Sequence, residues 1–250
     1  MKRIVITSIS IMLCFLTLAQ DPLLTTFEDS DKSVYTAELN RHNETSEDNT
    51  AYDINILLLD SDSNSYKVVK IGDQLWMAEN LRTTKFNDGT DIPLAQDYKE
   101  WSNRISPGYC WYYNKEDFKV NYGALYNWYT ISTDKLCPLG WHVPSAEEWN
   151  RLISYFDDKV AGGVLKEKGT KYWVSPNTGA TNATGFTALP GGSRGTLGSF
   201  FDEGLRGYWW SSTESDQNRA WYSALGYSSE KVTGNSDNKK GGLSVRCVKD

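Results

Sequence analysis

Few side chains in this chain of 250 residues could serve as the base for a nucleophile. The two histidines are His42, in a polar N-terminal stretch, and His142, so a serine or cysteine nucleophile of the folded part would depend on His142. The same histidine could instead be structural and bond the backbone where a helix begins. Asp202 and Glu203 are paired carboxylates, but adjacent residues do not converge on one bond as glycosidase carboxylates must. These residues indicate no catalytic site, and we expect a protein that is not an enzyme.

Metal ligands are equally sparse. Residues 87–91 place oxygen atoms on a glycine turn, but the segment lacks the distal glutamate and the spacing of a calcium loop, so a plain hairpin turn is favoured. Cys110, Cys137 and Cys247 are too far apart in the sequence for a zinc motif. We expect neither a metal ion nor another cofactor.

The N-terminus has the pattern of a secretory signal peptide. Residues 1–3 supply positive charge, an apolar stretch runs from Ile4 to Leu18, and Ala19 ends a small-residue motif suited to cleavage. The apolar stretch is shorter than the roughly 20 residues that span a bilayer, which argues against an uncleaved anchor. Lipidation at Cys14 is a further alternative, although the residue before it is not small. We expect residues 1–19 to be a signal peptide, with no transmembrane segment after its removal and a secreted or cell-surface protein.

The formal net charge of −6 is concentrated in an acidic leader. Residues 21–63 hold 11 Asp or Glu against Lys32 and Arg41, a net −9, whereas residues 64–250 hold 22 basic and 21 acidic side chains, a net +1. A balanced domain has no broad basic surface for phosphate groups, so we expect no nucleic-acid partner. Residues 20–52 lack the apolar side chains that would offset the entropy of ordering, and we predict a flexible leader before one domain over 53–250.

The local sequence pattern predicts a mixed domain. The clearest helix covers 146–157, with a capping box between Ser145 and Glu148 and one apolar stripe. A weaker helix is predicted over 122–131. Short strands between Gly, Pro, Asn and Asp turns are predicted over 54–59, 66–71, 74–77, 109–113, 185–189, 208–212, 220–228 and 243–248. The first of these could instead be an apolar part of the linker. Without alternating βαβ units, the pattern indicates an α+β fold.

Four segments resemble one known family. They are Cys137 to Pro144 (CPLGWHVP), Tyr122 to Tyr129 (YGALYNWY), Trp209 to Thr213 (WWSST) and Ser244 to Lys249 (SVRCVK). On these motifs, which are spread over most of the domain, the chain resembles the Fibrobacter succinogenes major paralogous domain family. The resemblance implies a secreted or surface-attached protein and little biochemistry, because most members have no assigned activity. It also implies a C-type lectin-like fold, with two helices, small antiparallel sheets, long loops and a disulfide staple.

The resemblance also bears on the cysteines. Three remain after signal removal, an odd number for an oxidising compartment, so at least one has no partner within the chain. Because Cys137 and Cys247 lie in the best matched segments, the resemblance implies a disulfide between them, which would remove about 4 to 5 kcal/mol of unfolded-state entropy. Cys110 lacks the neighbouring partner that the family pattern suggests. We expect it to be buried and inert, with an intermolecular disulfide as the alternative. The motif also places His142 beside the staple, which favours its structural role.

Two activities of fold relatives are not implied for this chain. The calcium-site tripeptides of sugar-binding C-type lectins are absent from residues 172–182 and from the sequence near Trp210, so calcium-dependent sugar binding is not carried over. Formylglycine-generating enzymes use an active-site cysteine pair, whereas Cys137 and Cys247 are assigned to the staple.

The remaining functional signal is a set of aromatic and charged residues on turn-rich segments. The candidate ligand-binding residues are Arg194, Asp202, Glu203, Trp209 and Trp221. Aromatic rings and an arginine beside Gly-rich backbone suit a sugar or a protein partner. Trp209 and Trp210 alternate along a strand, so at most one should be exposed. We expect a non-enzymatic binding or adhesion module at the bacterial cell surface, whose ligand is an unknown glycan or surface protein. The alternatives are a structural envelope or matrix component and an unrecognised enzyme of the formylglycine-generating-enzyme-like fold.

Overall fold

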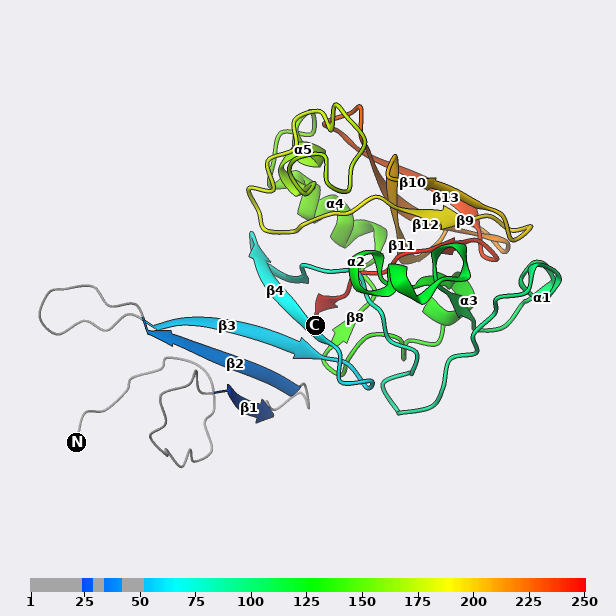
Figure 1. The fold of residues 1–250 in the computed structure, drawn as a ribbon, viewed down its shortest axis with the longest axis horizontal. Coiled ribbons are helices and arrows are strands. Elements are labelled where there is room, and N and C mark those ends of the chain that lie inside the picture. Colours follow the sequence, from blue (N-terminus) through cyan, green and yellow to red (C-terminus); the bar gives the residue numbers. More distant parts are fainter. Residues whose placement is uncertain (1–23, 29–33, 42–51) are drawn as a thin grey trace, which may run out of the picture.

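The computed structural model describes residues 24–28, 34–41 and 52–250 (Figure 1). The predicted signal peptide lies outside the described residues, as do parts of the predicted leader. Within that leader, strands β1 (Leu24–Glu28) and β2 (Val34–Arg41) pair with each other, and β2 pairs with β3 (Tyr52–Leu59). These two strands lie within the predicted leader, and its flexibility stays a prediction. Their backbone groups find hydrogen-bond partners in a neighbouring strand, which leader composition does not reveal.

The helices of the described residues are short. They are α1 (Tyr98–Asn103), the 3-10 helices η1 (Tyr112–Asn114) and η2 (Glu116–Phe118), α2 (Lys119–Tyr122), α3 (Trp128–Ile131), α4 (Ala146–Ser154) and α5 (Ala161–Leu165). The predicted capping box at α4 is confirmed. The Glu148 amide donates to Ser145 Oγ at 3.1 Å, and the Ser145 amide donates to Glu148 Oε2 at 2.8 Å.

Two sheets form the framework. The first has the order β1, β2, β3, β4 (Ser65–Ile71), β5 (Gln74–Met77), β15 (Val248–Lys249) and β8 (Trp141–His142). The second has the order β13 (Val232–Asn238), β12 (Arg219–Gly226), β11 (Arg206–Glu214), β9 (Gly191–Arg194), β14 (Gly242–Leu243), β7 (Leu125–Asn127) and β6 (Tyr109–Cys110), while β10 (Phe200–Glu203) pairs with β9. Among the described strands only β9 and β11 pair in parallel, at Gly192 and Gly207. This mixture of helices and largely antiparallel sheets confirms the α+β class.

Several predicted elements differ from the structure. The helix predicted over 122–131 is interrupted by β7. The chain turns at Gly123, which follows α2 with φ 70°, and the backbone then pairs with β6 and β14. Residues 185–189 form one isolated bridge, between Ala188 and Lys166, and not a strand. The predicted last strand is split between the two sheets as β14 and β15. The described residues also contain five short α-helices and larger sheets than the two helices and small sheets implied by the resemblance.

The predicted disulfide is confirmed. Cys137 and Cys247 are bonded, and their Cα atoms lie 6.0 Å apart. The bond ties the chain just before β15 to the loop that leads into β8. Cys110 is free and buried, as expected.

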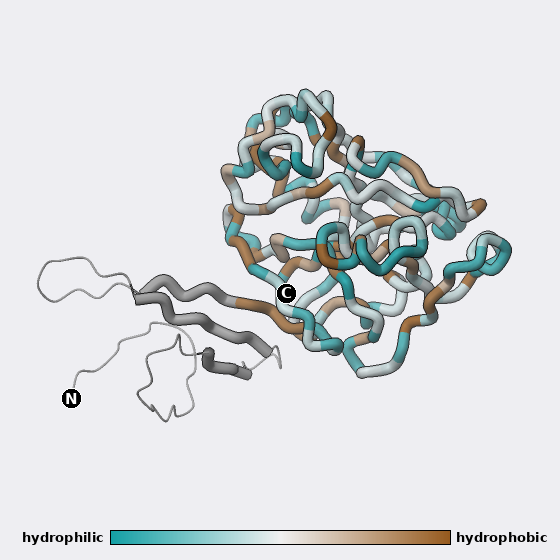
Figure 2. The backbone as a smooth tube through the Cα atoms, in the orientation of Figure 1, coloured by the Kyte–Doolittle hydropathy of each residue, from teal (hydrophilic) through white to brown (hydrophobic). Residues whose placement is uncertain are grey.

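The core lies on both faces of β11. Trp209 packs on one face with Trp149 of α4 and Trp76 of β5, whereas Trp210 packs on the other face with Tyr126 of β7. Both tryptophans are fully buried, because each face of this strand is covered. The predicted strand over 54–59 is confirmed as part of β3, whose apolar end meets the domain (Figure 2). Leu58 is completely buried there.

Buried cations hold the irregular segments. Lys166 donates through Nζ to the carbonyl oxygens of Thr178, Gly226 and Ser229, at 2.8 to 3.0 Å. Arg246 donates to the carbonyl oxygens of Phe186 and Thr187 and to Asn80 Oδ1. Burial lowers the pKa of Lys166 to about 8 and that of Arg246 to about 9. Residues 166–190 contain neither helix nor strand, so these cations satisfy carbonyl groups that a sheet would otherwise pair.

Within the described residues, no helix combines the length and the apolar character needed to cross a membrane.

Candidate functional site

Arg194 is not on the surface. Its side chain is buried, with 1% of the residue exposed. The guanidinium donates to the carbonyl oxygens of Ala95 at 2.6 Å, Gln96 at 2.9 Å and Gly198 at 3.0 Å. It also lies over the rings of Trp101 and Phe200, at 4.4 and 5.0 Å from the centroids. The prediction that Arg194 contacts a ligand is wrong, because its side chain is buried and holds the β9–β10 hairpin against the loop at Ala95.

The two candidate tryptophans occupy different environments. Trp209 is buried and donates through Nε1 to Asn80 Oδ1 at 2.8 Å, so its candidacy for ligand contact is also wrong. Trp221, on β12, is 41% exposed. Strand alternation places it on the opposite side of β12 from Tyr222, whose ring contacts Tyr208 and Trp210.

Asp202 and Glu203 lie at the surface end of β10. Asp202 accepts a hydrogen bond from the Tyr208 hydroxyl at 2.5 Å and has φ 65°, a backbone conformation uncommon for residues other than glycine. Glu203 is exposed, and its Oε1 accepts from the Tyr122 hydroxyl at 3.0 Å. Because Asp202 contacts Tyr208, it lies on the side of β11 and β12 that carries Tyr208 and Tyr222, and Trp221 lies on the other side. The five candidates therefore do not form one site.

A row of touching aromatic rings lies beside Glu203. Its members are Phe200, Tyr113, Phe118, Tyr122 and Tyr172, and we call these five residues the aromatic row. Successive ring centroids are separated by 5.5, 6.5, 5.8 and 6.3 Å. Tyr113 is 56% exposed, Tyr122 is buried, and the other three rings are half-buried. The row brings together β10, the short helices η1, η2 and α2, and the irregular segment after Lys166.

A buried ring supports the row. The Tyr112 centroid lies 4.7 Å from that of Tyr113, 5.5 Å from Phe118 and 5.2 Å from Phe200. Burial raises the pKa of Tyr112 to about 12. Burial, followed by the nearby carboxylate of Glu203, also raises the pKa of Tyr122. Both phenols therefore stay protonated near neutral pH. The Tyr122 hydroxyl donates to Glu203 Oε1, whereas the Tyr112 hydroxyl accepts from the Glu203 amide at 3.3 Å.

The exposed ring of Tyr113 is presented by an unusual turn. Tyr113 has φ 51° and ψ 21°, and the next residue, Asn114, has φ 55°. A bulky residue in this left-handed region costs on the order of 1 to 3 kcal/mol, and such strain occurs often at functional sites. Asn114 Nδ2 donates to the Gln96 carbonyl oxygen at 2.9 Å, the same oxygen that accepts from Arg194. Arg194 is therefore a positioning residue for this turn.

More apolar side chains are exposed around the tip of the β9–β10 hairpin. Leu197, Phe201 and Tyr98 are each more than half exposed. Gly198, at the turn with φ 91°, packs directly on the Tyr98 ring. The hairpin thus carries exposed apolar groups on its outside, while Arg194 fills its inside.

Charges near the row are balanced. Lys115, Lys119 and Lys171 are offset by Glu116, Asp117 and Glu203. Lys119 Nζ lies 3.6 Å from Glu116 Oε1, and Lys171 Nζ lies 4.7 Å from the centroid of the Tyr172 ring. These residues therefore provide no excess of basic groups for an anionic ligand.

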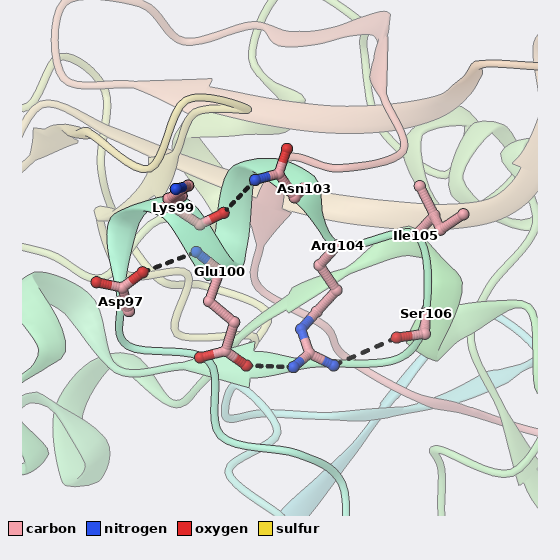
Figure 3. Close-up of a pocket in the computed structure, with 7 residues that line it drawn as sticks. All are labelled: Asp97, Lys99, Glu100, Asn103, Arg104, Ile105 and Ser106. Carbon is pink, nitrogen blue, oxygen red and sulfur yellow. Dashed lines mark hydrogen bonds and ion pairs between the residues drawn. The ribbon is translucent and has the colours of Figure 1, made fainter.

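An open depression of ≈ 520 Å³ lies at α1, next to the hairpin (Figure 3). Its polar groups are largely paired with one another. Asp97 caps the Glu100 amide at 2.8 Å, Asn103 Nδ2 donates to the Lys99 carbonyl oxygen at 3.0 Å, and Arg104 bonds both Glu100 and Ser106. Because these pairs stabilise the helix and its following loop, we do not assign the depression a ligand.

His142 is structural, but not through the backbone as predicted. Its Nδ1 lies 2.6 Å from Asp250 Oδ1 and its Nε2 lies 2.8 Å from Glu148 Oε1. Hydrogen bonding to Glu148, together with the weaker effect of Asp250, raises the pKa of His142 to about 9 against the effect of burial. The ring is therefore an imidazolium near neutral pH. With both nitrogens engaged, it is not placed to activate a hydroxyl or thiol group.

The other potential chemical groups have structural surroundings. Burial raises the pKa of the Cys110 thiol to about 12, so it is not a thiolate nucleophile. The turn over 87–91 is a hairpin, as predicted. The Phe86 amide donates to the Thr90 carbonyl oxygen at 2.8 Å, and the backbones of Lys85 and Asp91 form an antiparallel β-bridge. In the part of the chain that the structure describes, no group of three or more His, Cys, Asp or Glu side chains is placed to hold a metal ion.

The sequence analysis did not predict the aromatic row, although two of its candidates, Asp202 and Glu203, lie on β10 together with Phe200. Tyr113, Phe118 and Tyr122 lie within one short segment without a regular spacing, whereas Tyr172 and Phe200 come from distant parts of the chain. One signal was present, because Asn114 is a residue type that tolerates the left-handed conformation and it follows two tyrosines. The contacts between the rings require the folded structure.

Comparisons with known proteins match the chain to a family but not to a characterised relative. No curated protein and no solved structure matches it. The model of the Fibrobacter succinogenes major domain matches residues 69–249, which include α4, both disulfide cysteines and the whole aromatic row. The match covers more than half of the chain, and the chain therefore belongs to the Fibrobacter succinogenes major domain family.

Proposed function

We propose that this domain is a non-enzymatic binding module and that the aromatic row is its contact surface. The exposed Tyr113 ring, which a left-handed turn presents between Phe200 and Phe118 of the row, is the observation that carries this proposal. A protein whose aromatics served only the core would gain nothing from this backbone strain. Exposed aromatic residues on a supported surface are typical of binding sites.

The row is also preorganised. Each ring contacts the next, and Tyr112 supports three of the five from below. The turn itself is tied to the loop at Gln96 through Asn114 and Arg194. A ligand would therefore immobilise few free side chains when it binds, which lowers the entropic cost of association.

The surroundings of the reactive groups favour binding over catalysis. His142 is held between two carboxylates, and Cys110 is a buried thiol whose pKa is raised. Neither is arranged as an activated base or nucleophile. We therefore propose that the module holds its ligand without chemical change.

We further propose that the module is exported and acts at the cell surface. The Cys137–Cys247 disulfide supports this location, since disulfides persist in oxidising compartments. We also propose that the fold is a variant of the C-type lectin-like fold. The disulfide at the C-terminal strand and the long irregular segment over 166–190 support that relationship.

The proposal is tested by screening the purified protein against arrayed glycans and immobilised envelope proteins. We expect at least one ligand whose binding falls about tenfold or more in Tyr113→Ala, since an exposed aromatic anchor contributes on the order of 1 to 2 kcal/mol. The matched control is Trp221→Ala, which removes an exposed aromatic residue outside the row and should leave binding unchanged.

Two results would contradict the proposal. One is a ligand that Tyr113→Ala binds as tightly as the unmodified protein, which would move the contact surface away from the row. The other is the release of a chemically altered product from any bound ligand, which would indicate an enzyme. A complete screen without a ligand would favour a structural envelope component instead.

A further inference from the structure

We infer that the aromatic row binds an uncharged glycan chain, across several sugar units. This inference rests on the proposed function, since it names the ligand class of the same surface. It follows from the shape of the row, from the balance of charges around it and from the polar groups beside its rings.

The contiguity of the rings suits a ligand that itself consists of several rings. Four of the five rings reach solvent, and the buried Tyr122 ring connects Phe118 to Tyr172 at centroid separations of 5.8 and 6.3 Å. The faces of sugar rings present C–H groups, which pack on the electron-rich faces of aromatic rings. A single sugar could cover only part of such a row, so the full surface is used only by an oligosaccharide.

The charges near the row argue against an ionic ligand. Three lysines are offset by three carboxylates, and one lysine of the set already pairs with Glu116. A phosphate-bearing, sulfated or uronic-acid chain would require an excess of basic groups. An uncharged chain does not need such an excess of basic groups.

Polar atoms beside the rings match sugar hydroxyl groups, which both donate and accept. Glu203 is exposed and uses Oε1 for the Tyr122 hydroxyl, so its carboxylate retains acceptor capacity. The Tyr172 hydroxyl donates to Asn121 Oδ1 at 3.3 Å and retains lone pairs that can accept. These groups flank the rings, so one sugar can stack and hydrogen-bond at the same time.

The experiment is calorimetric titration of the purified protein with neutral oligosaccharides. The probes are glucan, xylan, mannan and galactan fragments, each from disaccharide to hexasaccharide, with polygalacturonate and a sulfated glycan as charged probes. We expect at least one neutral series to bind with an affinity that rises with chain length, and no binding of the charged probes at physiological salt.

Variants locate the binding. Tyr113→Ala and Tyr172→Ala should each lower the affinity for the bound series about tenfold, and Glu203→Gln should lower it less. Trp221→Ala should bind as the unmodified protein does. A thermal melt of each variant establishes that it is folded, and Tyr113→Phe, which keeps the ring, should retain most of the affinity.

The outcomes separate the inference from the proposed function. A protein ligand that depends on Tyr113, with no neutral series bound, would overturn the glycan inference and leave the binding module intact. Preferential binding of a charged probe would also overturn it. A neutral series bound equally well by Tyr113→Ala, Tyr172→Ala and the unmodified protein would overturn both, because the ligand would then lie elsewhere.

Discussion

Replacing Arg194 with alanine should destabilise the domain strongly. The guanidinium is completely enclosed, donates to three backbone carbonyl oxygens and lies over two aromatic rings. Arg194→Ala removes every one of these contacts. It also leaves three carbonyl groups, at Ala95, Gln96 and Gly198, without their charged donor.

The magnitude follows from these contacts. A buried group deprived of its partner costs about 1 to 3 kcal/mol, and loss of a desolvated cation–π contact costs up to about 2 kcal/mol. Water that enters the vacated space would recover part of the loss. We therefore expect a decrease of about 4 kcal/mol in the free energy of unfolding, which for a domain of this size lowers the melting temperature by roughly 8 to 16 °C.

The assay is urea and thermal unfolding followed by circular dichroism. Arg206→Ala is the control, because Arg206 is an exposed arginine on β11 and its loss should change the free energy of unfolding by about 0.5 kcal/mol or less. Arg194→Lys keeps the charge but not the planar fork, so its stability should lie between those of Arg194→Ala and the unmodified protein. A melting temperature of Arg194→Ala within about 2 °C of the unmodified protein would refute the structural role described above.

Three further predictions follow from the buried and strained positions. Cys110 should resist alkylation in the native protein at pH 8 and react only on unfolding, because its thiol is buried and its pKa is about 12. Mass spectrometry counts the alkyl groups added, and rapid labelling of the native protein would contradict this prediction. The contacts of His142 with Glu148 should stabilise the fold by about 1 kcal/mol, a value reduced by screening because 41% of the His142 side chain is exposed. The histidine part of this stability should be fully present below its unfolded pKa of 6.5 and lost as pH rises through about 9, while the Glu148 part should be lost as pH falls from 4.5 through about 2. Unfolding curves of His142→Ala that keep the same pH dependence would argue against it. Gly192→Ala should cost about 3 kcal/mol, since Gly192 has φ 64° and a methyl group there would clash with the Phe201 carbonyl oxygen, whereas Gly226→Ala, where the added group meets open space, should be nearly neutral.

Local features of the chain were readable from the sequence. Ser145 and Glu148 are separated by the spacing of a capping box, and the apolar stripe that follows required the helix now seen as α4. The pairing of Cys137 with Cys247 was implied by the family motifs around them and is present in the structure. Features of this kind depend on neighbouring residues or on a recognisable motif, so the sequence alone determines them.

The fate of residues 122–131 shows where local reasoning failed. Their apolar pattern suits a helix, but Gly123 turns the chain and the backbone of Leu125 to Asn127 finds strand partners in β6 and β14. The β14 partner comes from a distant part of the chain, and β6 also lies outside the predicted helix. Tertiary pairing therefore overrode the local preference.

Arg194 and Tyr113 show the same limit for the candidate site. An arginine in a Gly-rich hairpin is exposed by statistical expectation, and only the folded chain brings the carbonyl groups at Ala95 and Gln96 within its reach. Tyr113 was one aromatic residue among many until the turn and the neighbouring rings placed it at the surface. The sequence determined the main helix through the spacing of neighbouring residues, and it determined the family through short motifs, which in turn implied the disulfide. The burial of Arg194 and the contacts within the aromatic row were decided by the tertiary structure, because they depend on residues that are distant in the sequence.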